Sequence, residues 1–423
     1  MGHILIINKA LYGLKSSGLR WHERFADTLR DMGFTPSRAE NDIWMRPCEH
    51  GYKYIATYVD DLAICLPDPQ AIIDLLTETY GYKLKGTGPI SYHLGCDYFR
   101  DDDGTLCSAP RKYIEKMIDS YVQMFGQKPK EATSPLERGD HPELDTSPEL
   151  DAEGIKKYQS LIGSLQWAVS IGRFDITTAV MSMSSYRAAP RVGHLDRLKR
   201  IFGYLSKMRF ATIRFRTNEP DYSDITDEVY DWSYTVYAGA EELLPTDAPE
   251  PRGRRVTLTM YVDANLYHDM ATGRSVTGII HLMNQTPFDW YSKKQSTVET
   301  ATYGSEFTAA RIAMDHIIEH RTMLRYLGVP INHKTYLFGD NKSVVDSLST
   351  PHAKLHKRHT ALSFHRVREA IAAGIIRFVH LPGQFNPADI LSKHWGYSQV
   401  WEMLQAILFF PGDTSRMSLD EQH

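Results

Sequence analysis

The order of secondary-structure patterns between Val256 and His394 is the feature that most constrains the fold of this chain. A strand pattern at Val256–Val262 is followed by hairpin strands, a long helix from about Ala301 to Leu327, a strand at Lys334–Gly339, two more helices, a strand and a short helix. Strands interleaved with helices in this order form a mixed sheet that helices cover. The fold class we predict is therefore α/β (α+β), in a multidomain chain.

Length and composition limit the classes of protein to which the chain can belong. Its 423 residues are enough for several domains of ordinary size. No apolar run reaches the length of a membrane span, and the opening residues Met1–Ile7 lack the features of a signal peptide. The four cysteines form no Cys-x-x-Cys pair and are too few for a disulfide framework. We therefore expect a protein of a reducing compartment that is neither secreted nor bound to a membrane.

The N-terminal part predicts a helix followed by a strand pair. Apolar residues recur at helical spacing from Trp21 to Met32, and Gly33 is expected to end this helix. The segments Tyr52–Val59 and Leu62–Leu66 are rich in β-branched, aromatic and aliphatic residues, and only Asp60-Asp61 separates them. The pattern therefore predicts a tight hairpin with two aspartates at its tip.

Further elements are expected before the region that begins at Val256. A second hairpin is predicted from the strands Tyr92–Arg100 and Thr105–Ala109, with Gly104 in the turn between them. A helix is expected from Arg111 to about Met124. Prolines then mark a linker, and a mostly helical region extends from about Ile155 to Lys207. Within the polar span that follows, Tyr230–Ala238 could form a strand.

Asp60 and Asp61 are unusual residues for the tip of a hairpin. A two-residue hairpin loop normally contains glycine because its backbone requires positive φ angles. Adjacent carboxylates also repel each other unless a cation neutralises them, and Mg²⁺ prefers oxygen ligands of this kind. The pair is therefore a candidate magnesium site. The alternative is a polar turn with no function.

Four further acidic residues are candidates for a second metal site. Asp263 and Asp340 each follow a predicted strand, and acidic groups at the ends of neighbouring strands can converge. Glu306 falls within the apolar stripe of the long helix, where a carboxylate is costly unless it is paired or binds a metal. Asp389 starts a short helix just after Pro387. One such acid alone could be a solvated surface group, but the set along strand, helix, strand and helix predicts a cation site.

Several motifs in the first half resemble those of copia-type LTR retrotransposon Pol polyproteins. Tyr58-Val59-Asp60-Asp61 resembles the polymerase motif of reverse transcriptases, and Leu11–Gly18 with Arg20-Trp21 resembles the segment that precedes it in copia-type elements. Gly163-Ser164-Leu165 and Arg173–Ile176 resemble the helical region of the family, with Phe174 in place of the usual proline.

The second half resembles the ribonuclease H domain of the same elements. The order Asp263, Glu306, Asp340, Asp389 resembles that of retroelement ribonuclease H. The segments that flank these acids and look copia-type are Trp290–Gln295 with Glu299, Asp340–Ser343, Phe364–Glu369 and Ala388–Lys393. The resemblance extends from Asn8 to Lys393.

This resemblance implies five segments. They are a partial reverse transcriptase palm without its first catalytic strand and fingers (residues 1–128), a proline-punctuated linker with a helical thumb or connection region (129–216), a linker or insertion (217–254), a ribonuclease H-like mixed sheet with helices (255–395) and a C-terminal tail (396–423).

The resemblance also implies the chemistry. Asp60 and Asp61 are expected to bind metal in the polymerase site, and the four acids from Asp263 to Asp389 in the ribonuclease H site, with two Mg²⁺ ions per site and Mn²⁺ able to replace them. In this family the third polymerase carboxylate lies on a strand upstream of where this chain begins. We therefore expect RNA-directed DNA polymerase activity to be lost, and the RNA strand of RNA:DNA hybrids to be hydrolysed by a two-metal mechanism.

The expected partners are nucleic acids. They are an RNA:DNA hybrid and a DNA/RNA template-primer, together with the rest of the Pol polyprotein, in the cytoplasmic virus-like particle of the element and in the nucleus. The basic segment Lys354–Arg368 is a candidate for holding the hybrid backbone.

Two other functions compete with this interpretation. One is a catalytically inactive retroelement remnant that only binds nucleic acid. The other is a zinc peptidase, because His316-Ile317-Ile318-Glu319-His320 matches the H-x-x-E-H pattern. The surrounding ribonuclease H-like sequence argues against the peptidase.

Overall fold

The computed structural model describes residue 14 and residues 16–225, 230–332, 334–355, 360–396 and 403–408. Its several sheets and many helices confirm the predicted mixed α/β class. Residues 11–13 and 15 of the copia-type segment, and most of the expected tail 396–423, lie outside the described residues. Among the helices that the structure describes, none has the length and apolar character needed to cross a membrane.

The chain divides into two compact units. Unit 1 comprises Met1–His93, Leu244–Arg255 and Glu319–Ile331, and unit 2 comprises Leu94–Leu243, Val256–Ile318 and Asn332–His423. The five segments expected from the sequence have other limits, and they remain predictions.

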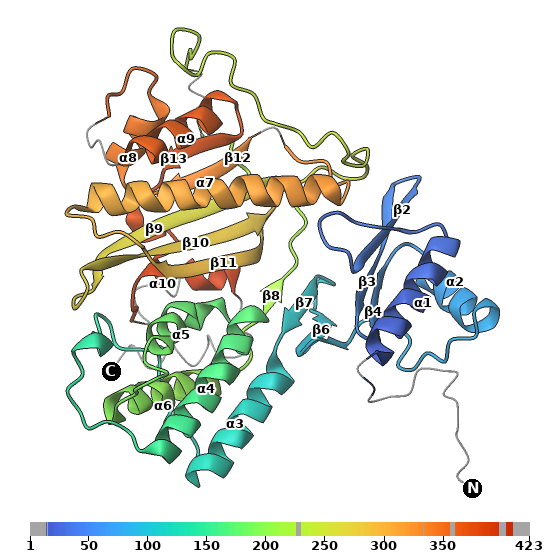
Figure 1. The fold of residues 1–423 in the computed structure, drawn as a ribbon, viewed down its shortest axis with the longest axis horizontal. Helices are drawn as coiled ribbons and strands as arrows, with labels where there is room; N and C mark the ends of the chain where they lie inside the picture. The colour runs from blue at the N-terminus through green and yellow to red at the C-terminus, as the bar shows by residue number, and fades with distance from the viewer. Residues whose placement is uncertain are drawn as a thin grey trace, which may run out of the picture. The chain divides into compact units, whose positions relative to one another are not determined.

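Unit 1 contains an antiparallel sheet with helices beside it (Figure 1). The strands lie in the order β1 (Thr35–Pro36), β2 (Ile43–Cys48), β3 (Gly51–Tyr58) and β4 (Asp61–Cys65), and the helical elements are α1 (Ser17–Asp31), α2 (Pro69–Asp74) and the π-helical turn η1 (Leu75–Thr79). Phe25 and Leu29 of α1 pack with Trp44 and Ile55 of the sheet. The predicted helix is confirmed, and Gly33 follows it with a left-handed φ of 80°.

The tip of the β3–β4 hairpin differs from the prediction by one residue. Tyr58 pairs with Asp61, so the loop consists of Val59 and Asp60, and Asp61 is the first residue of β4. Val59 has a φ of 55°, which is a costly conformation for a β-branched residue. The two aspartates are therefore neighbours in sequence that occupy different parts of the hairpin.

The first part of unit 2 is a small antiparallel sheet with a helical bundle. The strands β6 (Cys96–Arg100), β7 (Leu106–Ala109) and β8 (Ile213–Arg214) pair in this order. The main helices are α3 (Arg111–Phe125), α4 (Ala152–Ser170), α5 (Thr177–Ser184) and α6 (Val192–Lys207), with short 3-10 turns η2 (Pro142–Leu144) and η3 (Phe174–Ile176). The predicted strand Tyr92–Arg100 is interrupted after β5 (Tyr92–His93), because Leu94 and Gly95 have φ angles of 49° and 92°.

The region that begins at Val256 forms a five-stranded mixed sheet. Its order is β11 (Thr286–Lys294), β10 (Arg274–Met283), β9 (Leu258–Asp269), β12 (Thr335–Gly339) and β13 (Ile376–His380). The first three strands are antiparallel, and β12 is parallel to both β9 and β13. With α7 (Thr302–Tyr326), α8 (Lys342–Ser349), α9 (Ala361–Ala372), the 3-10 turn η5 (Gly383–Phe385) and α10 (Asp389–Ser392), the predicted order of elements is confirmed.

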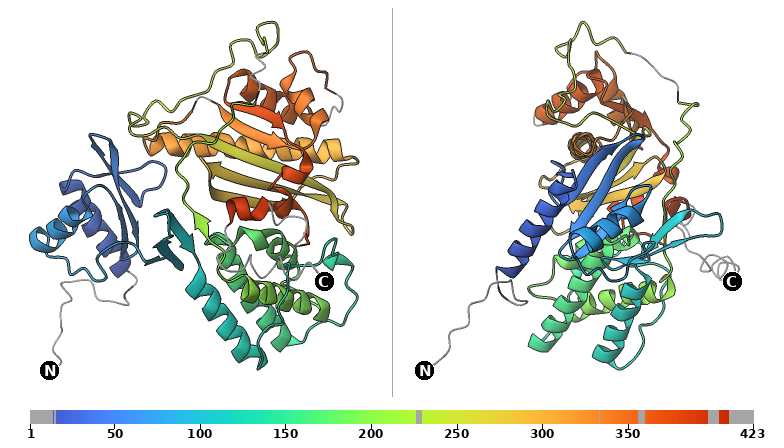
Figure 2. Two further views of the ribbon diagram at one scale, coloured as in Figure 1. Left: turned by 180° about the vertical axis from the view of Figure 1, so that it is seen from behind. Right: turned by 90° about the vertical axis from the view of Figure 1, so that its right-hand side faces the viewer.

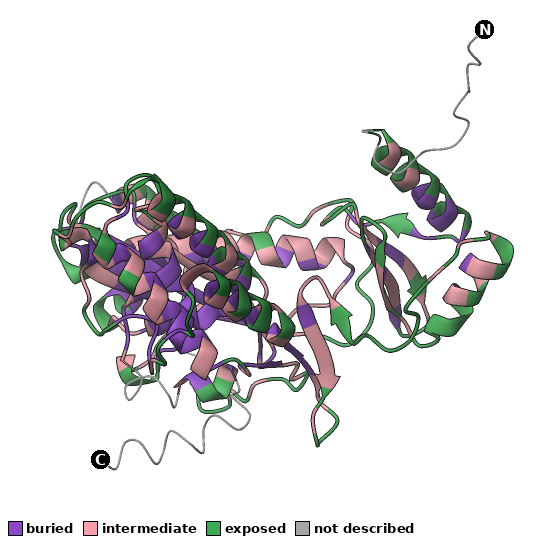
Figure 3. Ribbon diagram, turned by 90° about the horizontal axis from the view of Figure 1, so that it is seen from below, coloured by how far each residue is buried: buried purple, intermediate pink, exposed green. Residues whose placement is uncertain are grey.

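Helices cover both faces of this sheet. On one face, Val262, Ile279 and Leu337 pack against apolar residues of α7, α8 and α9. On the other face, Ile280 and Leu282 of β10 pack with α10 and with the bundle of α3 to α6. Figure 1 shows this layering, Figure 2 shows the same layers from behind, and Figure 3 shows the buried residues gathered within them.

The turn between α4 and α5 is fixed by a buried ion pair. Both Arg173 and Asp175 have fully buried side chains, and two hydrogen bonds of 3.0 and 2.7 Å join them. Tyr204 of α6 donates a further hydrogen bond of 2.7 Å to Asp175. Phe174, which replaces the family's proline, is buried, and its ring contacts that of Trp290 on β11 in a tilted arrangement with the centroids 5.3 Å apart. This turn therefore ties the bundle to the sheet.

Tyr230–Ala238, which the sequence allowed as a strand within the linker, does not form one. These residues adopt turns, in which the Thr235 N–H donates to the Trp232 carbonyl over 3.0 Å. The Tyr237 hydroxyl lies 2.7 Å from His365 Nδ1, and the Arg368 guanidinium lies over the rings of Trp232 and Tyr237. The side chains of this segment thus contact α9, and its described backbone pairs with no strand.

Candidate active site

Asp263 lies inside β9, whereas the sequence predicted it at the end of a strand. The strand continues to Asp269 because β10 pairs with it along this length, with Gly278 opposite Asp263. The parallel pairing with β12 stops one residue earlier, at Val262 and Gly339. Asp263 is therefore the first residue of β9 beyond the end of β12, and its side chain is 1% exposed.

Asp340 and Glu306 join Asp263 from two other elements. Asp340 directly follows β12, as predicted, and Glu306 comes from the first turns of α7. One ligand atom from each of Asp263, Glu306 and Asp340 lies within 4.8 Å of the other two. The structure thus brings together three of the four acids proposed for the second site.

Burial shapes the electrostatics of this group. Glu306 is 6% exposed, and its burial raises its pKa well above the ordinary value, with Asp263 and Asp340 adding to the effect. Burial also raises the pKa of Asp340, and the negative charge of Asp263 adds to this rise. Carboxylates held this close in a dry environment favour either protonation or a bound cation.

Asp389 borders the group from α10. Burial and the charge of Asp263 together raise the pKa of Asp389 to about 7. Lys393, the residue after α10, places its Nζ 2.7 Å from Asp389 Oδ1 and 3.3 Å from Asp263. The proximity of Asp263 and Asp389 raises the pKa of this lysine, against the effect of its own burial. All four predicted acids therefore lie in one neighbourhood, with an ammonium group between two of them.

Three residues that support this arrangement had no role in the sequence prediction. Asn386, fully buried, donates to the Val262 carbonyl over 2.9 Å and accepts from the Ala388 N–H over 3.1 Å. Ser392 donates a hydrogen bond to Asp263 Oδ2. A Cβ at Gly278 would lie 2.6 to 2.7 Å from backbone atoms of α10 and its N-cap. The sequence could have indicated Asn386 and Ser392, because both lie three positions from Asp389. No sequence feature indicated Gly278.

Asp60 and Asp61 are in unit 1 and are both exposed. Among the described residues, neither belongs to a group of three or more potential metal ligands with donor atoms within 4.8 Å of one another. Asp42, an aspartate upstream of this hairpin, lies 2.7 Å from His22 Nε2 and accepts a hydrogen bond from the Thr57 hydroxyl. The structure thus holds the two aspartates on one hairpin. Among the described residues, no third carboxylate completes a metal site with them.

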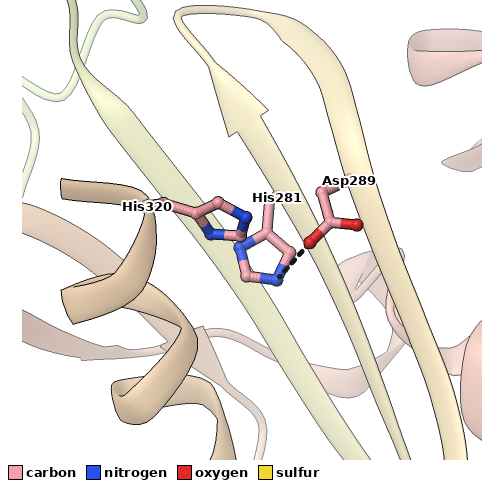
Figure 4. Close-up of side chains that lie close together, drawn as sticks. All are labelled: His281, Asp289 and His320. Atoms are coloured by element: carbon pink, nitrogen blue, oxygen red, sulfur yellow. Dashed lines mark ion pairs between the residues drawn. The ribbon is translucent and has the colours of Figure 1, made fainter. Parts of the chain in front are cut away.

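The H-x-x-E-H pattern lies in the second half of α7. His316 Nδ1 is 3.3 Å from Nε2 of His281 on β10, and the two rings are stacked. His281 Nε2 lies 3.6 Å from Asp289 Oδ2 on β11, a pair that Figure 4 shows together with His320, the last residue of the pattern. Because His281 already engages His316 and Glu319 is exposed, these contacts do not favour the peptidase interpretation.

The basic segment Lys354–Arg368 is only partly available to a ligand. Arg368 is 2% exposed and donates hydrogen bonds to the carbonyls of Ser347, Thr350 and Pro351 over 2.6 to 2.8 Å. Arg368 is therefore not available to contact a nucleic acid, and this part of the prediction is wrong. Lys354 and Arg366 are exposed, and residues 356–359 lie outside the described part of the chain.

Comparisons with known proteins agree with the family expected from the motifs. Residues 1–135 match the model of the reverse transcriptase (RNA-dependent DNA polymerase) family. The chain is 28% identical over 311 residues to the putative transposon Ty5-1 protein YCL074W of Saccharomyces cerevisiae, covering 72% of this chain and 87% of that protein.

Plant relatives extend the similarity over most of the chain. The retrovirus-related Pol polyproteins from transposon RE1 of Arabidopsis thaliana and transposon TNT 1-94 of Nicotiana tabacum are both 24% identical to it, over 92% of this chain. The match spans 24% and 27% of their respective lengths, so the chain corresponds to about a quarter of each polyprotein. The predicted resemblance to retrotransposon Pol polyproteins is thus confirmed.

Two solved structures illustrate the similarity to other proteins of known fold. LC11-RNase H1 in complex with RNA/DNA hybrid matches 32% of this chain and 94% of its own, with 16% identity and a TM-score of 0.27. RNase H1 from Halobacterium salinarum NRC-1 matches 33% and 95%, with 16% identity and a TM-score of 0.26.

Proposed function

We propose that this chain hydrolyses the RNA strand of RNA:DNA hybrids at the carboxylate site of unit 2, which consists of Asp263, Glu306, Asp340 and Asp389. The chain is a relative of retrotransposon Pol polyproteins, and its residues 1–135 match the reverse transcriptase family. The observation that supports this most is the group of Asp263, Glu306 and Asp340, with ligand atoms within 4.8 Å of one another. Two of these three side chains are almost fully buried.

The donor set fits a hard divalent cation. All the ligands are carboxylate oxygens, which Mg²⁺ prefers, and burial without a cation destabilises their charged forms. Asp263, Glu306 and Asp340 would hold one Mg²⁺, and Asp263 with Asp389 would hold a second. Mn²⁺ could replace either ion, because it accepts the same oxygen ligands.

Bound Mg²⁺ would supply an activated water and neutralise charge on the scissile phosphate. The chain's own residues hold the ligands in place. Ser392 orients Asp263 through its hydroxyl, and Asn386 joins the segment before α10 to β9. Exposed Lys354 and Arg366 would contribute to binding the hybrid backbone, and groups that read the 2′-hydroxyl would select the RNA strand.

For the polymerase reaction we propose that this polypeptide alone does not extend a primer. Two-metal phosphoryl transfer needs carboxylates that bridge both ions, and no described acid joins Asp60 and Asp61 within 4.8 Å. A template-primer would then bind without being extended. We further propose that the chain works with other parts of a Pol polyprotein, in the cytoplasmic particle of the element and in the nucleus.

The test is magnesium-dependent cleavage of a labelled RNA strand in an RNA:DNA hybrid, with an RNA:RNA duplex as the control substrate. Asp340→Asn should abolish cleavage. Asp315→Asn is the matched control, because Asp315 is likewise a partly buried aspartate but pairs with Arg311 on α7, with a side chain 44% exposed. It should cleave like the wild type.

The outcomes distinguish the two functions under consideration. The ribonuclease H proposal is supported if the wild type cleaves the RNA:DNA hybrid but not the RNA:RNA duplex, and if this cleavage is lost in Asp340→Asn and kept in Asp315→Asn. Folded proteins that bind the hybrid and never cut it would instead identify an inactive remnant that only binds nucleic acid.

A further inference from the structure

The carboxylate site of unit 2 contains a cation supplied by the chain itself. Lys393 Nζ lies 2.7 Å from Asp389 Oδ1 and 3.3 Å from both oxygens of Asp263. Lys393 also offsets the effect of burial on Glu306 and Asp340, since its charge opposes the rise in their pKa values. Among the four acids, Asp263 and Asp389 are therefore the pair that the ammonium group joins.

This pair is also the one that a second divalent ion would use. The group of Asp263, Glu306 and Asp340 has its ligand atoms together without Asp389, whereas Asp389 and Asp263 share the ammonium group of Lys393. A dication and an ammonium cannot occupy the same position between two carboxylates, because both need direct contact with the oxygens.

The ammonium group of Lys393 can move away from Asp263 and Asp389 into solvent. Its side chain is 38% exposed, while those of Asp263 and Asp389 are 1% and 24% exposed. It is the first residue after α10, and its flexible four-carbon stem permits other rotamers that point to solvent. Withdrawal of the ammonium group therefore requires no movement of the strands.

We propose that Lys393 is an internal counter-ion that competes with the second divalent cation for Asp263 and Asp389, and so sets the metal concentration at which the site fills. This inference rests on the proposed function, because it assumes that the acids bind a metal. Without metal, Lys393 stabilises the folded chain. With metal, it withdraws and becomes accessible.

The first experiment measures Mg²⁺-dependent thermal stabilisation of the full chain, at constant ionic strength so that screening does not change. Lys393→Met removes the charge at similar size, and should lower the melting temperature without metal and reduce the half-saturating Mg²⁺ concentration about tenfold, which corresponds to about 1.4 kcal/mol. Lys393→Arg keeps the charge and should stay near the wild type. Lys157→Met is the matched control, since Lys157 pairs with Glu153 on α4 and is 34% exposed.

The second experiment uses the wild-type chain and so does not depend on the folding of a variant. Acetic anhydride labelling followed by mass spectrometry should modify Lys393 slowly without Mg²⁺ and several-fold faster with it, because a contact with two carboxylates protects the amine. Labelling of Lys157 should not change.

The outcomes separate this inference from the proposed function. A lower half-saturating concentration in Lys393→Met together with metal-dependent labelling supports the competition. Normal Mg²⁺ stabilisation with an unchanged or higher half-saturating concentration in Lys393→Met overturns the role of Lys393 and leaves the metal site standing. Absence of any Mg²⁺ stabilisation in the wild type overturns both.

Discussion

Gly278 of β10 is the position where a single methyl group should disturb the carboxylate site most. A Cβ there would lie 2.6 Å from the Leu391 carbonyl carbon, 2.7 Å from the Ala388 oxygen and 2.7 Å from the Ser392 nitrogen, all of them backbone atoms. Ordinary contact begins at 3.4 Å, so α10 must move by about 0.8 Å in Gly278→Ala.

This displacement should affect both stability and catalysis. Overpacking of this kind costs about 1–3 kcal/mol, and we expect a loss of about 2 kcal/mol in the free energy of unfolding. Metal ligands tolerate misplacement of only about 0.2 Å, so Asp389 should no longer share an ion with Asp263, and cleavage of an RNA:DNA hybrid should fall about 100-fold.

The assay combines urea denaturation with the hybrid-cleavage measurement at saturating Mg²⁺. Gly163→Ala in α4 is the matched control, because a Cβ there meets nothing within 4 Å. It should raise stability by up to about 1 kcal/mol, as alanine does in a helix, and leave cleavage unchanged. If Gly278→Ala is as stable and as active as the wild type, the packing of α10 on β10 does not position the site, and this reasoning is refuted.

Three further predictions concern buried ionisable side chains. Glu306→Gln should stabilise the metal-free chain by about 1–2 kcal/mol in urea denaturation, because it removes a buried carboxylate whose pKa burial raises, and should abolish stabilisation by Mg²⁺. Burial lowers the pKa of His268 to about 4, from 6.5 in the unfolded chain, so between these two pH values only the unfolded chain protonates this histidine. The free energy of unfolding should therefore fall by about 2 kcal/mol from pH 8 to pH 5. A series of urea denaturations at different pH values should show a smaller fall in His268→Gln. Asp175→Asn leaves the buried Arg173 unpaired and should cost about 3–5 kcal/mol, whereas an unchanged urea midpoint would contradict a structural role for this pair.

The order of elements and the identities of the acidic residues follow from the sequence by itself. Helical spacing from Trp21 to Met32 and the glycine at position 33 predicted α1, and the element order after Val256 predicted the mixed sheet. These signals are local, because periodicity and turn residues depend on neighbours along the chain. The motifs around Asp263, Glu306, Asp340 and Asp389 likewise predicted the resemblance to retrotransposon Pol polyproteins, and the comparisons confirm this resemblance.

Only the tertiary structure decided how these residues meet. Asp263 lies within β9 because β10 extends beyond β12, and the length of a partner strand is not visible in the sequence of β9. Arg368 points inward to three carbonyls, although its basic neighbours suggested a surface. Lys393 reaches Asp263 across 130 positions of sequence. Strand register and packing are long-range properties, so the contacts that control charge at the site appear only when the sheet and α10 are assembled.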